Sequence, residues 1–179
     1  METKTKSVLQ VMKALTWIVF IGLCIKVGAM LFSFFVSLFV NPEAAKDLYL
    51  GLNLSELFNF SKLHYVNMFI LVIISPILKA YLFFLLIKVF STINLKHPFS
   101  SAIRLLLSNI SLVALSIGMS SVIAVSYYGW LYKKGMLLYS LPRHISGSSE
   151  FLFFAGIIFI ISLIFKRGIE MQSENDLTV

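Results

Sequence analysis

Two lysines stand inside long apolar stretches of this 179-residue sequence, where a positive charge is costly. Lys26 interrupts the apolar residues 14–40, and Lys79 interrupts residues 66–87. A cation in the hydrocarbon layer of a membrane costs roughly 2.5–3.5 kcal/mol on insertion scales, so it usually faces the interior of a helix bundle and has a polar partner there. Lysines in such a place could bind an anion or a polar lipid headgroup. Other outcomes stay open, because a lysine can also extend its ammonium group to the membrane surface or lose its proton.

The carboxylate closest in depth to Lys26 is that of Glu150. Measured from the basic residues at the helix ends, Lys26 lies about 20 Å, Lys79 about 13 Å and Glu150 about 24 Å from one membrane boundary at the helical rise per residue. We therefore expect an ion pair between Lys26 and Glu150. Lys79 can donate to backbone carbonyls that lack their usual donor near Pro76, or to hydroxyls of the third apolar segment. Together, Lys26, Lys79 and Glu150 are predicted to form a polar or anion-binding site inside the membrane.

Four membrane-crossing helices must position these side chains. The chain has 59% hydrophobic and 13% charged residues, whereas a soluble domain carries about 25% charged residues. An apolar stretch of about 20 residues is long enough to cross a bilayer as a helix. We expect one domain, residues 1–179, with the all-α fold of an integral membrane four-helix bundle. The expected helices cover residues 14–40, 66–87, 105–130 and 151–165, and a short tail follows at 166–179.

The first connecting segment, residues 41–65, has the pattern of short helices that lie at the membrane interface. Asn41 and Ser55 are each placed to cap such a helix, because both side chains can accept a hydrogen bond from a backbone N–H group. The aromatic residues of the segment, Tyr65 among them, are of the kind found at the level of the lipid headgroups. The third helix is predicted to pack closely on a neighbouring helix, since small residues allow close approach and hydroxyls can bond across the contact. The small residues are Ser116, Ser120 and Ala124 at four-residue spacing, with Gly118 and Ser121 adjoining.

The orientation of the helices follows from the distribution of Lys and Arg, which are enriched on the cytoplasmic side of membrane proteins. With the N-terminus inside, eight of these residues lie on the cytoplasmic side and five lie outside. Residues 88–104 then form a cytoplasmic elbow between two membrane hairpins, in which Ser100 or Ser101 can cap the next helix. The first apolar run is too long for the core of a signal peptide, so we expect it to remain as a helix. Both termini are predicted to be cytoplasmic.

Few side chains of this sequence are suited to metal binding or catalysis. The three histidines lie in three different connecting segments without the spacing of metal ligands, and Cys24 is the single cysteine. No carboxylate pair or nucleophile–base set is present. We therefore expect no catalytic residue, no metal site and no cofactor. The net charge of +7 is explained by topology and by contact with membrane lipids, so direct nucleic-acid binding is not expected.

Two short motifs carry a family resemblance. They are Pro98-Phe99-Ser100 in the elbow and residues 165–179 at the C-terminus, which include Arg167-Gly168 and end in Glu-Asn-Asp-Leu-Thr-Val. With these motifs and four helices, the chain resembles a family of small bacterial membrane proteins that is catalogued as domain of unknown function number twenty-nine seventy-five. Members are often encoded beside a small helix-turn-helix regulator of the Cro/CI type. The resemblance implies a bacterial inner-membrane location and control of a transcription factor, and it supplies no catalytic residues.

The C-terminal tail combines acidic and apolar residues. We predict that it docks on a cytoplasmic protein, because an acidic strip with an apolar end could bind a basic, DNA-reading surface. The alternative is a solvated end that only stops the last helix. The docking residues would be Glu170, Glu174, Asp176, Leu177 and Val179. The leading functional prediction is thus a non-enzymatic anchor, sensor or antagonist of a helix-turn-helix regulator, and the alternative is a lipid- or anion-binding carrier that uses the intramembrane lysines.

Overall fold

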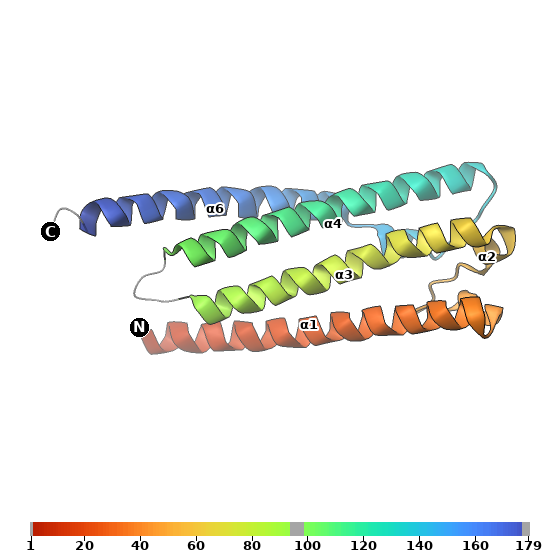
Figure 1. Ribbon diagram of the computed structural model, residues 1–179, viewed down its shortest axis with the longest axis horizontal. Helices are drawn as coiled ribbons and strands as arrows, with labels where there is room; N and C mark the ends of the chain where they lie inside the picture. Colours follow the sequence, from red (N-terminus) through yellow and green to blue (C-terminus); the bar gives the residue numbers. More distant parts are fainter. Residues whose placement is uncertain (1, 94–98, 177–179) are drawn as a thin grey trace.

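The computed structural model describes residues 2–93 and 99–176, and nearly all of them are helical. The described residues contain no strand, which confirms the all-α class. In chain order the elements are α1 (Glu2–Phe39), the 3-10 helix η1 (Pro42–Lys46), α2 (Ser55–Phe60), α3 (Lys62–Thr92), α4 (Ser101–Lys133), α5 (Pro142–Ile145) and α6 (Ser148–Asp176) (Figure 1).

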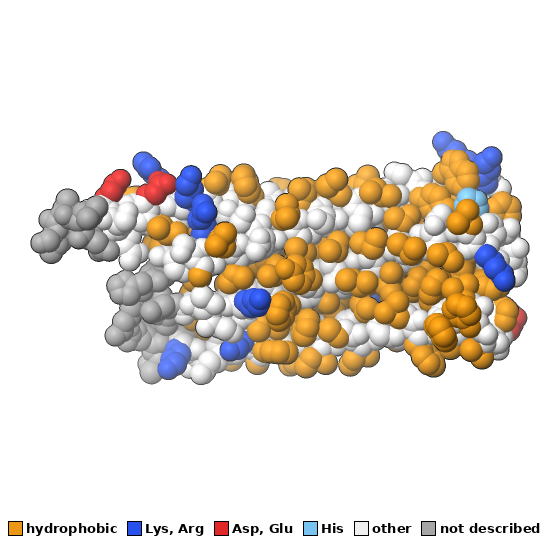
Figure 2. Space-filling view, viewed as in Figure 1, with side chains coloured by type: hydrophobic (Ala, Val, Ile, Leu, Met, Phe, Trp, Pro, Cys, Tyr) orange, Lys and Arg blue, Asp and Glu red, His pale blue; other side chains and the backbone are white. Residues whose placement is uncertain are grey.

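Four long helices, α1, α3, α4 and α6, make up the body of the molecule. By length and composition, four helical segments of the described residues could cross a membrane, so the chain is a multi-pass membrane protein. On the face shown in Figure 2, hydrophobic side chains cover the middle of the bundle, and Lys and Arg side chains gather towards its two ends. Both chain termini lie at one end, which we call the terminal end, and η1 and α2 lie at the opposite, distal end (Figure 1).

The long helices pack in chain order, with α1 against α3, α3 against α4 and α4 against α6. The helices in the middle of this row bury more of their most apolar window, 39% for α3 and 44% for α4, than the helices at its edges. In α1 only 6% of that window is buried within the protein, and in the segment that contains α6 only 11%. Lipid chains can solvate such apolar faces as well as protein can, so the bundle needs no further cover there.

The helices extend further than their apolar stretches. α1 begins at Glu2 instead of residue 14, and α6 covers Ser148–Asp176 instead of residues 151–165. The predicted boundaries were too short because they marked the apolar residues, whereas polar residues continue a helix when nothing interrupts its backbone bonding. The described part of the predicted tail is therefore not a separate end but a continuation of α6. α3 and α4 likewise extend a few residues beyond the predicted 66–87 and 105–130 at both ends.

Two of the predicted helix caps are present and one is wrong. The side chain of Ser100 accepts a hydrogen bond from the N–H of Ile103 at the start of α4, over 3.3 Å. Asn41 Oδ1 accepts from the N–H of Glu43 over 3.0 Å, although the helix that it caps is η1 and not an α-helix. Ser55 is the first residue of α2 and not its cap.

The distal end is closed by a packed cap made from the segment between α1 and α3. Asn53 Oδ1 accepts hydrogen bonds from both the N–H and the hydroxyl of Ser55, the first residue of α2. Tyr65 is completely buried, so its ring contacts protein and not lipid. Its hydroxyl lies 2.5 Å from that of Ser37 on α1. The apolar side chains of the cap are buried together, namely Leu48, Leu52, Leu54 and Leu57.

α4 and α6 approach each other closely at Gly118. A Cβ atom added there would lie 2.6 Å from side-chain carbons of Leu152, so the contact depends on glycine. Gly118 belongs to the group of small residues that the sequence predicts to pack against a neighbouring helix, and Ser121 and Ala124 of the same group are buried. Ser116 and Ser120 do not bond across the contact, because each hydroxyl donates to a carbonyl of its own helix over 2.9 Å.

Candidate functional site

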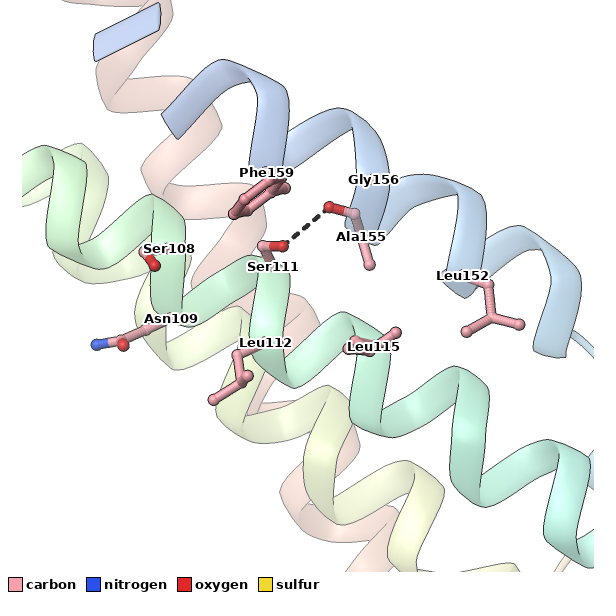
Figure 3. Close-up of a pocket in the computed structure, with 9 residues that line it drawn as sticks. All are labelled: Ser108, Asn109, Ser111, Leu112, Leu115, Leu152, Ala155, Gly156 and Phe159. Atoms are coloured by element: carbon pink, nitrogen blue, oxygen red, sulfur yellow. Dashed lines mark hydrogen bonds between the residues drawn. The ribbon is translucent and has the colours of Figure 1, made fainter. Parts of the chain in front are cut away.

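A groove with a volume of about 410 Å³ lies between α4 and α6 (Figure 3). Within the groove, Ser111 of α4 donates a hydrogen bond to the carbonyl of Ala155 of α6 over 2.9 Å. Asn109, at one end, points away from α6 in this view. The remaining lining is mostly apolar, from Leu112, Leu115, Leu152 and Phe159. Since no ionisable side chain lines the groove, it offers a surface for apolar chains but no site for chemistry.

A smaller pocket, of about 160 Å³, lies between α1, α3 and α5, and we call it the lysine pocket. It brings together the two lysines that the sequence places inside the membrane, Lys26 from α1 and Lys79 from α3. His144 from α5 and Ser75 from α3 add polar groups to the same wall. Its other lining residues are Leu23, Met30, Val72 and Pro76.

Helical spacing explains how α3 contributes to the lysine pocket. Val72, Ser75, Pro76 and Lys79 recur at intervals of three or four residues in its sequence, so they share one face of the helix. Pro76 has no N–H group, so it removes the donor that would normally bond to the carbonyl of Val72. α3 therefore presents a cation, a hydroxyl and a carbonyl without its intrahelical donor on the face that lines this pocket.

Each lysine of the pocket lies over an aromatic ring. Lys26 Nζ is 5.3 Å from the ring centroid of Tyr49, and Lys79 Nζ is 4.9 Å from that of Phe151. A cation–π contact stabilises an ammonium group by about 0.5–2 kcal/mol, which offsets part of the cost of removing it from water. Within the described residues, no carboxylate forms an ion pair with either lysine. Both side chains are partly buried, so the site concentrates positive charge.

The predicted ion pair between Lys26 and Glu150 is not formed. The carboxylate of Glu150 is exposed and accepts a hydrogen bond from the hydroxyl of Ser149 over 3.1 Å. The helical rise predicted that the two residues lie at a similar depth in the membrane. It does not predict the direction in which each side chain points around its helix. α6 packs on α4, and α3 and α4 lie between α6 and α1, which carries Lys26. The residue after Glu150, Phe151, contacts Lys79 of α3 instead.

Sequence reasoning missed His144, which we had treated as an isolated histidine in a connecting segment. The structure brings it to the lysine pocket on the short helix α5. Leu141 and Ile145 hold that segment in place, because both are buried in the hydrophobic core of the distal end. The four-residue spacing of these two apolar residues was the available signal that the segment packs inward.

The predicted docking residues lie at the other end of α6, away from the lysine pocket. Glu170 accepts a hydrogen bond from Arg167 over 3.0 Å, in an exposed ion pair. Glu174 is also exposed on α6. Asp176 ends the helix, but its side chain lies outside the described residues, and so do Leu177 and Val179.

The two motifs that carry the family resemblance meet at the terminal end. The ring of Phe99 packs edge-to-face on that of Phe165, with 5.3 Å between the centroids. It also covers Gly168, where an added Cβ atom would lie 2.6 Å from a carbon of the Phe99 ring. We call this contact the Phe99–Gly168 junction. Of the elbow motif, Pro98 lies outside the described residues.

Among the described residues, no group of three or more His, Cys, Asp or Glu side chains could hold a metal ion. The lysine pocket instead brings together the basic side chains of Lys26, Lys79 and His144.

Comparison with known proteins identifies a family. A family model described as "Protein of unknown function (DUF2975)" matches residues 40–179. No curated protein and no solved structure matches the chain. The matched residues include Lys79, His144 and the whole Phe99–Gly168 junction, whereas Lys26 precedes them.

Proposed function

The chain belongs to the DUF2975 family, and we propose that it is a non-enzymatic membrane anchor or sensor that controls a cytoplasmic helix-turn-helix regulator. The observation that carries this proposal is the continuity of α6, which runs without interruption from Phe151 beside the lysine pocket to the acidic residues of the terminal end. A single helix thus links a polar pocket in the membrane to a surface suited to bind a partner.

The proposed orientation places the terminal end in the cytoplasm of a bacterial cell, with the bundle in its inner membrane. Basic residues at the ends of the long helices support it, because Lys and Arg are enriched on the cytoplasmic side. Those at the terminal end include Lys13, Lys88, Arg104, Lys166 and Arg167.

Labelling of engineered cysteines from outside the cell tests this orientation. In a Cys24→Ser background, a cysteine at Tyr139, which is 82% exposed at the distal end, should react with an impermeant thiol reagent. A cysteine at Ser173, which is exposed on α6, should react only after the membrane is permeabilised. The reverse pattern would place the terminal end outside and exclude a cytoplasmic partner.

We call residues 166–176, the part of α6 that follows its apolar stretch, the α6 extension. Its acidic side chains support a protein partner with a basic surface. Glu170 and Glu174 lie one turn apart on the same face of an exposed helix. A DNA-binding protein presents Lys and Arg to the phosphate backbone, so an acidic helix complements that same surface and can compete with DNA for it. In this proposal the membrane protein withdraws the regulator from its operator and does not bind nucleic acid itself.

A reporter experiment tests the proposed function. A helix-turn-helix regulator of the Cro/CI type, taken from beside a gene of this family, is expressed with a reporter for its promoter, together with the full-length protein or a variant that lacks residues 169–179. The full-length protein should change reporter output several-fold, and the truncated protein should not, although it reaches the membrane in equal amount. A Glu170→Gln, Glu174→Gln variant should lose most of the effect, and Met171→Gln, an exposed change nearby, should retain it. Equal output with full-length and truncated protein would contradict the proposal.

The lysine pocket favours a second candidate function, that of a carrier for anions or anionic lipids. A carrier must open to each side in turn, and many carriers do this with two repeated halves and interrupted helices at the binding site. Pro76 is the feature of this kind in α3. Anion flux into vesicles that contain the purified protein tests this function, and a rate no higher than that of empty vesicles would exclude it.

A further inference from the structure

We propose that the lysine pocket is a binding site for a phosphate group, carried either by the headgroup of an anionic lipid or by free inorganic phosphate. The site would serve equally as the sensing site of a regulator or as the binding step of a carrier. The inference does not depend on partner binding by α6, because it rests on the pocket alone.

The balance of hydrogen-bonding groups in the pocket selects a negatively charged ligand. Each lysine ammonium group has three N–H donors and no acceptor. The hydroxyl of Ser75 lies on a residue that is 8% exposed, and it makes no hydrogen bond to any described residue. His144 can supply a further ring N–H. Donors therefore exceed acceptors, and an oxyanion is the ligand that can accept from several of them at once.

The electrostatics point to the same class of ligand. Lys26 and Lys79 repel each other across a pocket with no described carboxylate between them. Phe151 and Tyr49 contact the ammonium groups through their ring faces, which satisfies them only in part. An anion between the two lysines would convert this repulsion into two favourable contacts, each strengthened by the low polarity of the surroundings.

The size of the pocket limits the ligand to a single small group. About 160 Å³ holds on the order of five water molecules at about 30 Å³ each. A phosphate group fits such a space, whereas a nucleotide or the whole of a lipid does not. A lipid would therefore insert its headgroup phosphate and leave its acyl chains in the bilayer.

The depth of the pocket brings it within reach of one lipid leaflet. If Lys26 lies about 20 Å from the membrane boundary at the terminal end, it lies about 10 Å from the other boundary of a roughly 30 Å hydrocarbon core. A lysine side chain can extend its ammonium group several ångströms towards the headgroups. Tyr49 and His144, which come from the distal connecting segments, meet Lys26 on this side.

Binding is tested on the full-length protein in nanodiscs made of phosphatidylcholine. Thermal unfolding is recorded as phosphatidylglycerol is added to the lipid in one arm and as inorganic phosphate is added to the buffer in the other. The unfolding temperature should rise in a saturable way in at least one arm. A rise with phosphatidylglycerol alone assigns the phosphate to a lipid, and a rise with inorganic phosphate alone assigns it to a free ion.

Variants locate the effect. Lys26→Met and Lys79→Met should each weaken the apparent affinity about tenfold, since each removes one charge-assisted contact, and Lys26→Arg should retain binding because it keeps the charge. Lys62→Met is the matched control, because Lys62 also lies over an aromatic ring, 5.7 Å from the centroid of Phe58, but does not line the pocket. Ser75→Ala should weaken binding severalfold. Because it is a smaller change, it tests the site if a methionine variant does not fold.

Three results would overturn the proposal. The first is an unfolding temperature that neither phosphatidylglycerol nor inorganic phosphate raises. The second is an equal loss of binding in Lys62→Met, which would indicate attraction to surface charge in general. The third is an equal response to acetate, which would show that the site does not select phosphate. None of these results bears on the reporter experiment, so the two proposals fail separately.

Discussion

The lysine pocket and the α6 extension differ in how their charged side chains are paired and buried. In the extension, Arg167 and Glu170 form an ion pair with side chains that are 76% and 41% exposed. In the pocket, Lys26 and Lys79 are partly buried, and no described carboxylate pairs with them. An exposed pair adds about 0–1 kcal/mol to stability, whereas a cation in the membrane costs several kcal/mol. Charge in the extension is therefore nearly neutral for folding, and charge in the pocket is retained against a folding cost.

This difference indicates where selection for function is expected to act. A charged group that costs stability and still persists is a functional candidate, because a neutral side chain would fold better in its place. The charges of the extension carry no such signal, and their role has to be tested through a partner. The following predictions challenge this contrast, from the largest expected effect to the smallest.

Replacing both pocket lysines with methionine should stabilise the ligand-free protein. We expect Lys26→Met, Lys79→Met to raise the free energy of unfolding by about 3 kcal/mol, since two desolvated cations are removed and only two cation–π contacts are lost. Unfolding in mixed detergent micelles with increasing dodecyl sulfate measures this change. A loss of stability would mean that the lysines hold the bundle together, and the contrast between the two regions would be wrong.

Adding a methyl group at the Phe99–Gly168 junction should destabilise the terminal end. In Gly168→Ala the new Cβ atom would lie 2.6 Å from the Phe99 ring, and overpacking of this kind costs about 1–3 kcal/mol. The same unfolding measurement applies, with Gly156→Ala as the control, because an added Cβ atom there meets nothing within 4 Å. Equal stability of the two variants would mean that Phe99 moves aside without cost. Packing at the Phe99–Gly168 junction would then contribute little to the free energy of unfolding.

Removing the hydroxyl of Tyr65 should cost about 1 kcal/mol, the value of one buried hydrogen bond. In Tyr65→Phe the hydroxyl of Ser37 loses its 2.5 Å partner but keeps its hydrogen bond to the carbonyl of Phe34. In a Ser37→Ala background, Tyr65→Phe should cost much less than it does in the unchanged protein, because the partner of the Tyr65 hydroxyl is already gone. Additive losses would show that each residue stabilises the distal cap independently.

Breaking the exposed ion pair should have the smallest effect on folding. We expect Glu170→Gln to change the free energy of unfolding by less than about 0.5 kcal/mol at physiological salt. The measurement is repeated at low and high ionic strength, because screening should remove what remains of the effect. A loss above 1 kcal/mol would indicate that the α6 extension is a structural element of the bundle, and the contrast with the lysine pocket would disappear.

The sequence predicts features that depend on one segment at a time. The four helices follow from apolar length, and the caps at Ser100 and Asn41 follow from local hydrogen-bonding chemistry. The depth of Lys26 and Lys79 also follows from the helical rise, and the structure places the two lysines in one pocket.

Features that depend on direction around the bundle could not be predicted. Glu150 lies near the depth expected for a partner of Lys26 but faces elsewhere, whereas His144, from a segment that looked like an ordinary loop, reaches the pocket. Tyr65 has the composition of an interfacial aromatic, yet it is buried because the distal cap folds over it. The position of a residue along its helix axis can be predicted from the sequence. The direction in which each helix faces depends on how all the helices pack together.

The position of α1 at the edge of the row has a consequence for biosynthesis. α1 is made first and brings Lys26 into the membrane before α3, which carries Lys79, exists. At translation rates of about 5–20 residues per second, His144 follows Lys26 by on the order of ten seconds. Early in that interval, before α3 enters the membrane, the first lysine lies in lipid on a helix that has not met its neighbour. A newly made chain is thus most open to misinsertion and to quality-control proteases early in its synthesis, and that exposure ends only when α5 closes the pocket.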